Sequence, residues 1–229
     1  MGSMGLSLLA GPANAGKVAL LLERYLGALE SDPFLIVPNR PDVDRAEREL
    51  LARSGALVGG SIGTFDDVFA RLARSNGAHK PVVTPAQRTL LLRRVVAHAR
   101  TQSLARSARF TGFADALGAT VAELEAALLE PGDLDGELAE LYAAYREELD
   151  RLGLWDRELE RRYAAERIAN ELAAWDGKPV FAYGFEDLTA AEWALIEALA
   201  GRAEVDVSLP YEPGRAAFEI GRASCRERV

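Results

Sequence analysis

Short apolar runs alternate with amphipathic stretches over the first 80 residues of the chain. Apolar residues fill 6–10 and 34–37, and a third short run leads through 57–63. Continuous apolar strands are typical of a parallel sheet that is covered on both faces. Between and after these runs, apolar residues recur at helical spacing. The pattern therefore predicts three parallel strands joined by right-handed crossovers, with helices at 16–29, 42–53 and 64–75.

The pattern becomes almost entirely helical from Thr84 to about Gly177. A capping box with proline at the first helical position opens this region, and four helices are expected to begin near residues 84, 110, 134 and 155. Ordinary helix-on-helix packing is expected to hold them together. The side chains expected on the packed face of the first helix are Leu90, Leu91, Val95 and Val96.

The α/β pattern then returns, with strands expected at 179–183 and 204–209 and a helix from Thr189 to Ala200 between them. We therefore predict an α/β fold with a P-loop NTPase-like parallel sheet that is interrupted by an all-helical insertion. The expected parts are residues 5–80 of the α/β domain, a helical insertion at 81–178, and a return to the α/β domain at 179–218.

The turn after the first strand has the spacing of a phosphate-binding loop. Gly11 and Gly16 frame four residues, and Lys17 follows. Glycines let backbone N–H groups surround a phosphate, the start of the next helix favours an anion, and lysine reaches the outer phosphates. A plain strand-to-helix turn is the structural alternative. The predicted nucleotide-binding residues are Gly11, Asn14, Ala15, Gly16, Lys17 and Val18.

Val18 departs from the usual pattern of such loops. A serine or threonine at this position would place its hydroxyl on Mg²⁺, whereas valine can pack but cannot ligate a metal. The loop is therefore expected to hold phosphate while handling Mg²⁺ poorly.

Composition narrows the choice of partners and setting. The net charge of −8 gives no bulk attraction for nucleic acid, so any DNA contact has to be local. One such candidate is the basic stretch from Arg93 to Phe110, although a solvated helix face is the more frequent explanation of such a stretch. No apolar run approaches membrane-spanning length. Cys225 is the single cysteine, which excludes disulfide bonds within the chain and fits a reducing, cytoplasmic setting.

The last eleven residues, 219–229, do not match the rest of the chain. They hold the only cysteine and have no packing pattern, and they resemble the translation of a sequencing adapter. We expect an artefact at 219–229 and a natural protein that continues beyond about Phe218. A frayed natural tail is the alternative.

Three stretches together resemble the N-terminal part of AddB-type (RexB-like) subunits of bacterial helicase–nucleases, which are relatives of UvrD-like superfamily 1 motors and of RecC. They are GPANAGKV at 11–18, SIGTFDDVFARLA at 61–73 and VFAYGFEDLTAAEWALIEAL at 180–199. The resemblance implies double-strand-break processing, ATP as cofactor, DNA as a partner and an AddA-like second subunit. It also implies a 1B-like helical insertion and a nuclease domain that these residues do not contain.

Active motors of this superfamily carry an Asp-Glu pair that holds Mg²⁺ and activates water. Laid on this sequence, the pair falls on Tyr183 and Gly184, unless the register shifts so that Glu186 or Asp187 serves. The resemblance thus implies a degenerate motor, with no catalytic or metal-binding residue assigned. It also places DNA contacts after the second and third strands, at Asn39, Arg40, Thr64 and Phe65, where Phe65 either stacks on a base or packs in the core.

Two other interpretations stay open at this point. The chain could be an unrelated P-loop ATPase or kinase, which predicts Mg²⁺-dependent turnover and is disfavoured by Val18. It could also be a non-catalytic, RecC-like scanning module whose loop is vestigial, which predicts no nucleotide affinity.

Overall fold

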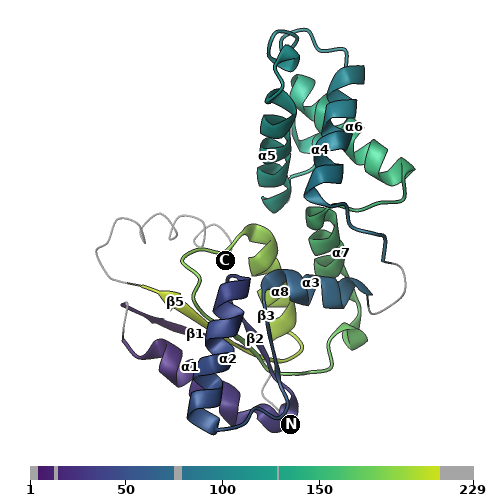
Figure 1. Ribbon diagram of the computed structural model, residues 1–229. Helices are drawn as coiled ribbons and strands as arrows, with labels where there is room; N and C mark the ends of the chain where they lie inside the picture. Colours follow the sequence, from purple (N-terminus) through teal and green to yellow (C-terminus); the bar gives the residue numbers. More distant parts are fainter. Residues whose placement is uncertain (1–4, 13–14, 75–78, 128, 212–229) are drawn as a thin grey trace. The chain divides into compact units, whose positions relative to one another are not determined.

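Among the described residues, five strands and eight α-helices form, and the helices α3 to α7 follow one another between β3 and β4, as the apolar pattern predicts (Figure 1). The structure, a computed structural model, describes residues 5–12, 15–74, 79–127 and 129–211. The predicted artefact at 219–229 and the predicted binding residue Asn14 lie outside the described residues. The strands are β1 (Gly5–Gly11), β2 (Phe34–Ile36), β3 (Ser61–Gly63), β4 (Val180–Ala182) and β5 (Glu204–Pro210). The helices are α1 (Lys17–Gly27), α2 (Arg40–Ser54), α3 (Phe65–Arg74), α4 (Pro85–His98), α5 (Phe113–Ala126), α6 (Gly136–Arg151), α7 (Arg157–Asn170) and α8 (Ala190–Ala200).

All five strands form one parallel sheet in the order β1-β5-β4-β2-β3. The predicted parallel α/β fold is confirmed. The last strand in the sequence, β5, lies between β1 and β4, so that β1 is an edge strand with β5 as its neighbour. This order places the carboxyl ends of all five strands along one edge of the sheet, where parallel sheets bind ligands.

Helices α1 and α2 cover one face of the sheet (Figure 1). Their apolar stripes meet the strands in a cluster of fully or almost fully buried side chains, and this cluster sets the position of the first helix relative to β1. Its members are Leu21, Leu22 and Tyr25 of α1, Ala46 and Leu50 of α2, Leu35, Val37 and Phe181.

The chain divides into two compact units. The first comprises Met1–Val68, Trp175–Leu188 and Ile196–Val229, and the second comprises Phe69–Ala174 and Thr189–Leu195. The second unit, which we call the helical unit, contains the expected helical insertion, but it begins within α3 rather than at residue 81. The end of α3 therefore packs with the helices that follow it.

The helical unit has its own apolar core, built from α4, α5 and α6. Buried residues include Leu92 and Val95 of α4, Leu117 and Val121 of α5, and Tyr145 of α6. One sequence expectation is wrong here, because Leu90 is 65% exposed while Leu92 is buried. Leu92 and Val95 are three residues apart and share the inward face, which turns Leu90 toward water.

Candidate functional site

The predicted phosphate loop begins at the carboxyl end of β1. Gly11 is the last residue of this strand and pairs with Pro210 of β5, and its carbonyl oxygen also accepts a hydrogen bond from the Tyr211 N–H at 2.8 Å. The strand end is therefore fixed by the neighbouring strand on one side. The loop leaves the sheet at the edge where the other strands also end, as ligand binding requires.

Lys17 starts α1 and reaches back over this loop. Its Nζ donates to the carbonyl oxygen of Gly11 at 2.8 Å and to that of Pro12 at 2.5 Å. The half-buried ammonium group is thus held by two carbonyl oxygens at the beginning of the loop. This placement suits a lysine that contacts outer phosphates as a point charge.

The start of α1 is arranged to accept an anion. Gly16 precedes the helix with φ +78°, a left-handed conformation that side chains with a Cβ rarely adopt, and Ala15 before it is exposed. No side chain caps the helix and no acidic residue lies in its first turn. The first N–H groups of α1 and the positive end of its dipole are therefore uncompensated by protein groups within the described residues.

Val18 packs against the cluster formed by α1, α2 and the sheet rather than projecting a polar atom toward the loop. The hydroxyl that would bind Mg²⁺ is thus replaced by a methyl group that serves the core. Within the described residues, no group of three or more His, Cys, Asp and Glu side chains is placed to hold a metal ion. The residues present fit the phosphates of a nucleotide, but this donor set does not fit its metal.

Tyr183 follows β4 and is the first residue onto which the resemblance lays the Asp-Glu pair of active motors. Its N–H donates to the carbonyl oxygen of Ile36 at 3.2 Å, and its ring packs against the same apolar cluster. Burial, followed by the nearby charges of Glu49 and Asp42, raises the pKa of the Tyr183 hydroxyl to about 12. The phenol is therefore neutral near pH 7 and cannot replace a carboxylate.

Gly184 is the second residue onto which the resemblance lays the Asp-Glu pair of active motors. Its φ is +89°, and a Cβ at this residue would lie 3.2 Å from Cγ and Cδ of Pro38. A side chain here would be strained by the backbone and crowded by the proline ring. The backbone and the neighbouring proline therefore disfavour a glutamate at residue 184.

Glu186 and Asp187 are both exposed in the segment between β4 and α8. The Asp187 carboxylate accepts a hydrogen bond from the Leu188 N–H at 2.8 Å, which gives it a local structural role. Neither residue belongs to a group that could hold a metal ion among the described residues. The alternative to a degenerate site is that the alignment with the Asp-Glu pair of active motors shifts, so that Glu186 or Asp187 takes the place of one of its carboxylates.

The predicted DNA contacts after β2 have structural partners. Asn39 caps α2 by accepting the Asp42 N–H at 3.0 Å, and Arg40 forms a 2.7 Å ion pair with Asp67. Both side chains are exposed at the sheet edge. The amide nitrogen of Asn39 and the 71% exposed Arg40 can still meet a phosphate backbone, so these contacts stay predictions.

The predicted contacts after β3 differ from each other. Thr64 directly precedes α3, and its N–H and its hydroxyl both donate to the Asp67 carboxylate, at 2.8 and 3.0 Å. Phe65 is only 3% exposed, and its ring lies 5.0 Å from that of Phe185. This burial favours the packing role of Phe65 over base stacking.

Sequence reasoning missed two features of this edge. The close approach of Gly184 to Pro38 depends on β4 lying beside β2, which no local pattern reveals. The raised pKa of the Tyr183 hydroxyl depends on burial and on Glu49 and Asp42 of α2, which are far from Tyr183 in the sequence. The only available signal was the pair of residue types at 183 and 184.

Comparison with known proteins gives one consistent result. The chain is 31% identical over 239 residues to a Moorella thermoacetica protein named as the B-type subunit of an ATP-dependent helicase/deoxyribonuclease, and the match covers 92% of this chain and 21% of that protein. Proteins of the same name from Desulfitobacterium hafniense and Desulforamulus reducens are 26% and 25% identical, again over 92% of the chain. The chain spans about a fifth of the length of these relatives. No family model matches.

Proposed function

Because the chain resembles the B-type subunits of ATP-dependent helicase/deoxyribonucleases over nine-tenths of its length, we propose that it is the nucleotide-binding, DNA-engaging part of such a protein. The uncapped start of α1, with the Lys17 ammonium over the loop, is the observation that carries this proposal. Backbone amides and one ammonium group bind the phosphates of ATP.

The motor is proposed to be degenerate. ATP hydrolysis requires Mg²⁺ bridging the outer phosphates and a group that orients or activates water. Val18, Tyr183 and Gly184 offer neither a metal ligand nor a base at the positions where active motors have them. Nucleotide binding then serves to hold the α/β unit in one conformation rather than to drive movement.

The same proposal includes DNA engagement and a second, AddA-like subunit. The names of the relatives describe helicase and deoxyribonuclease subunits. The AddA-like protein would supply the active motor, and the parent protein would act in repair of double-strand breaks in the cytoplasm. Among the described residues, none of the helices is long and apolar enough to pass through a lipid bilayer.

ATP turnover in the presence of single-stranded DNA tests the degenerate motor. We expect the chain, and the complete protein that contains it, to release phosphate at a rate that does not change in the Lys17→Ala variant. A degenerate site predicts this because the chemical step lacks its metal ligand and its base. A robust rate that falls by an order of magnitude or more in Lys17→Ala would contradict degeneracy.

One observation favours the second candidate, a RecC-like module with a vestigial loop. Both carbonyls that Lys17 contacts belong to the loop itself, so the ammonium is already satisfied without a nucleotide. That candidate predicts no nucleotide affinity with or without Mg²⁺. A direct binding measurement therefore separates the two.

A further inference from the structure

The first half of the helical unit contains a long stretch of sequence without acidic side chains. From residue 68 to residue 114 the sequence holds no aspartate or glutamate, although the whole chain has 35 acidic residues. The same stretch holds eight arginines and one lysine. Positive charge is therefore concentrated on one part of a chain whose net charge is −8, and such a segregated patch attracts polyanions locally.

Four of these arginines are exposed and form no ion pair with another described residue. They are Arg93 on α4 and Arg100, Arg106 and Arg109 in the segment 99–112, which joins α4 to α5 and which we call the basic loop. Most other arginines of the helical unit are paired, as Arg151 is with Glu148. Unpaired guanidinium groups are available to bind phosphate in a bidentate manner.

The basic loop is held in place by one carboxylate. Glu137 of α6 accepts the N–H groups of Gln102 and Ser103 at 2.6 Å and that of Leu104 at 2.9 Å. These backbone hydrogen bonds, with that of Leu104 the largest cause, lower the pKa of the Glu137 carboxyl. Glu137 therefore directs its charge to the backbone amides of the basic loop and not to its arginines, and these hydrogen bonds fix the loop backbone at 102–104.

An aromatic side chain lies at the end of the basic loop. Phe110 is 68% exposed and directly follows Arg109. Its backbone is fixed on both sides, because its N–H donates to the carbonyl oxygen of Ser107 at 3.0 Å and its carbonyl accepts the Phe113 N–H at 3.0 Å. An exposed phenyl ring beside arginines offers a stacking surface for an unpaired base, which duplex DNA does not present.

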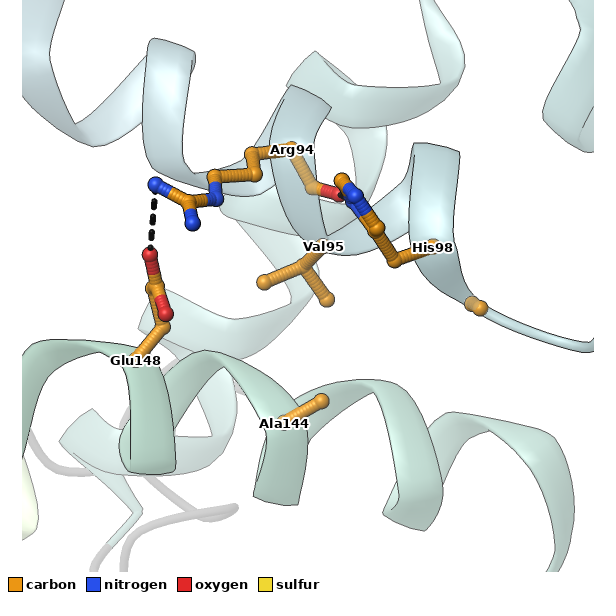
Figure 2. A pocket seen from close by; sticks show the side chains of 6 residues that line it. Arg94, Val95, His98, Ala144 and Glu148 are labelled. Carbon is orange, nitrogen blue, oxygen red and sulfur yellow. Dashed lines mark hydrogen bonds and ion pairs between the residues drawn. The ribbon is translucent and has the colours of Figure 1, made fainter. Parts of the chain in front are cut away.

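A cavity of about 300 Å³ lies between the last turns of α4 and helix α6, where α4 leads into the basic loop (Figure 2). Val95 of α4 and Ala144 of α6 line it on the apolar side, and the ion pair of Arg94 with Glu148 closes one side at 3.2 Å. Glu148 also binds Arg151 at 2.8 Å, so one carboxylate organises two guanidinium groups and the local charge stays positive. This volume is large enough for a nucleobase or a sugar-phosphate unit.

His98 gives the cavity a further polar atom. Its Nδ1 lies 2.8 Å from the carbonyl oxygen of Arg94, and because a carbonyl can only accept, Nδ1 carries the hydrogen. The imidazole is thereby held at the rim of the cavity with Nε2 turned away from this bond. Nε2 is left to contact a bound sugar or base.

We propose that the basic loop and the adjoining cavity on α4 bind single-stranded DNA, with Phe110 stacking on a base and Arg100, Arg106 and Arg109 contacting phosphates. This inference rests on the proposed DNA engagement and deepens it by naming the surface. Single-stranded rather than duplex DNA follows from the exposed ring, since stacking on Phe110 needs an unpaired base.

Fluorescence anisotropy with a labelled oligo-dT and a blunt duplex of equal length tests this surface, using the full chain without nucleotide. We expect tighter binding to oligo-dT than to the duplex. Phe110→Ala is expected to weaken oligo-dT binding about 10-fold, and Phe110→Trp to retain it. Removing two phosphate contacts in Arg106→Ala/Arg109→Ala is expected to reduce the salt slope by about 1.4.

Leu90→Ala is the matched control, because Leu90 is an apolar residue of α4 that is exposed to the same degree as Phe110. It is expected to change the affinity less than twofold. The inference would be overturned if Phe110→Ala bound oligo-dT with wild-type affinity. It would also be overturned if the chain bound the duplex as tightly as oligo-dT and only the arginine substitutions weakened binding. Either result would leave the proposed DNA engagement intact. No oligo-dT binding by the wild-type chain would overturn both, and the nucleotide site would be judged separately by ATP binding.

Discussion

Replacing Lys17 with alanine is expected to weaken ATP binding by the chain about 30-fold, the value of one or two charge-assisted hydrogen bonds. The Lys17 ammonium is the cation at the mouth of the loop, and its present acceptors, the carbonyls of Gly11 and Pro12, are within the loop that a phosphate would fill. Removing it leaves the N–H groups of α1 as the remaining phosphate ligands. Isothermal titration calorimetry of the two chains gives the ratio directly.

Lys80→Ala provides the control for the loss of a lysine. The Lys80 side chain forms a 2.9 Å ion pair with Asp150 in the helical unit, so the net charge changes equally while the loop is untouched. ATP affinity should stay within twofold of wild type. If both variants bound ATP equally weakly, the loss of net positive charge would explain the effect. Lys17 would then not be a ligand of the phosphates.

Replacing Glu125 with glutamine is expected to stabilise the chain by about 5 kcal/mol at pH 9, because a pKa that is raised from 4.5 to about 8 in the folded chain converts at roughly 1.4 kcal/mol per unit. Glu125 of α5 is 7% exposed, and neither carboxylate oxygen has a hydrogen-bond partner among the described residues. Desolvation, followed by the charge of Asp156, raises the pKa of Glu125 to about 8, against the opposing charges of Arg146 and Arg88.

The sign of the pH dependence follows from this raised pKa. Between about 4.5 and about 8 the folded chain holds a proton on Glu125 that the unfolded chain has lost. The wild-type free energy of unfolding therefore falls as the pH rises through this window, since the unfolded state binds fewer protons. Glutamine keeps the shape and hydrogen-bonding atoms of the protonated acid, so the variant should lose this part of the pH dependence.

Urea unfolding at pH 5 and pH 9, followed by circular dichroism, measures both effects. Glu123→Gln is the matched control, since Glu123 is exposed on the same helix. We expect the stability difference between the Glu125 variant and wild type to grow with pH and the control difference to stay near zero. A difference that is the same at both pH values would mean that Glu125 is charged in the folded chain at pH 5.

The existence of the strands and helices could be predicted because each carries its own periodicity. The apolar run at 34–37 became β2, and the capping box at Thr84, with hydrogen bonds in both directions, starts α4. The order of the strands could not be predicted, because a parallel strand can pair with any other that is buried on both faces. That β5 lies between β1 and β4 is a property of the assembled sheet alone.

The same distinction between local and long-range features applies to the candidate site. The positive φ of Gly16 and the hydrogen bond from Lys17 back to Gly11 are local features, so a sequence motif can indicate them, whereas their roles in phosphate binding stay a prediction. The burial of Phe65 against Phe185 could not, since the two residues are far apart in sequence. Glu125 looks like an ordinary polar position of an amphipathic helix, and only the packing of α5 with its neighbours makes it a buried acid.

The affinity of the wild-type chain for ATP, measured once with Mg²⁺ and once with EDTA, tests the central claim most directly. A phosphate cradle with Val18 and Tyr183 at the two positions expected to hold Mg²⁺ predicts binding in both conditions, with affinities within about twofold. Binding at least tenfold tighter with Mg²⁺ would show that the metal site is intact. Absence of binding in both conditions would show that the loop is vestigial.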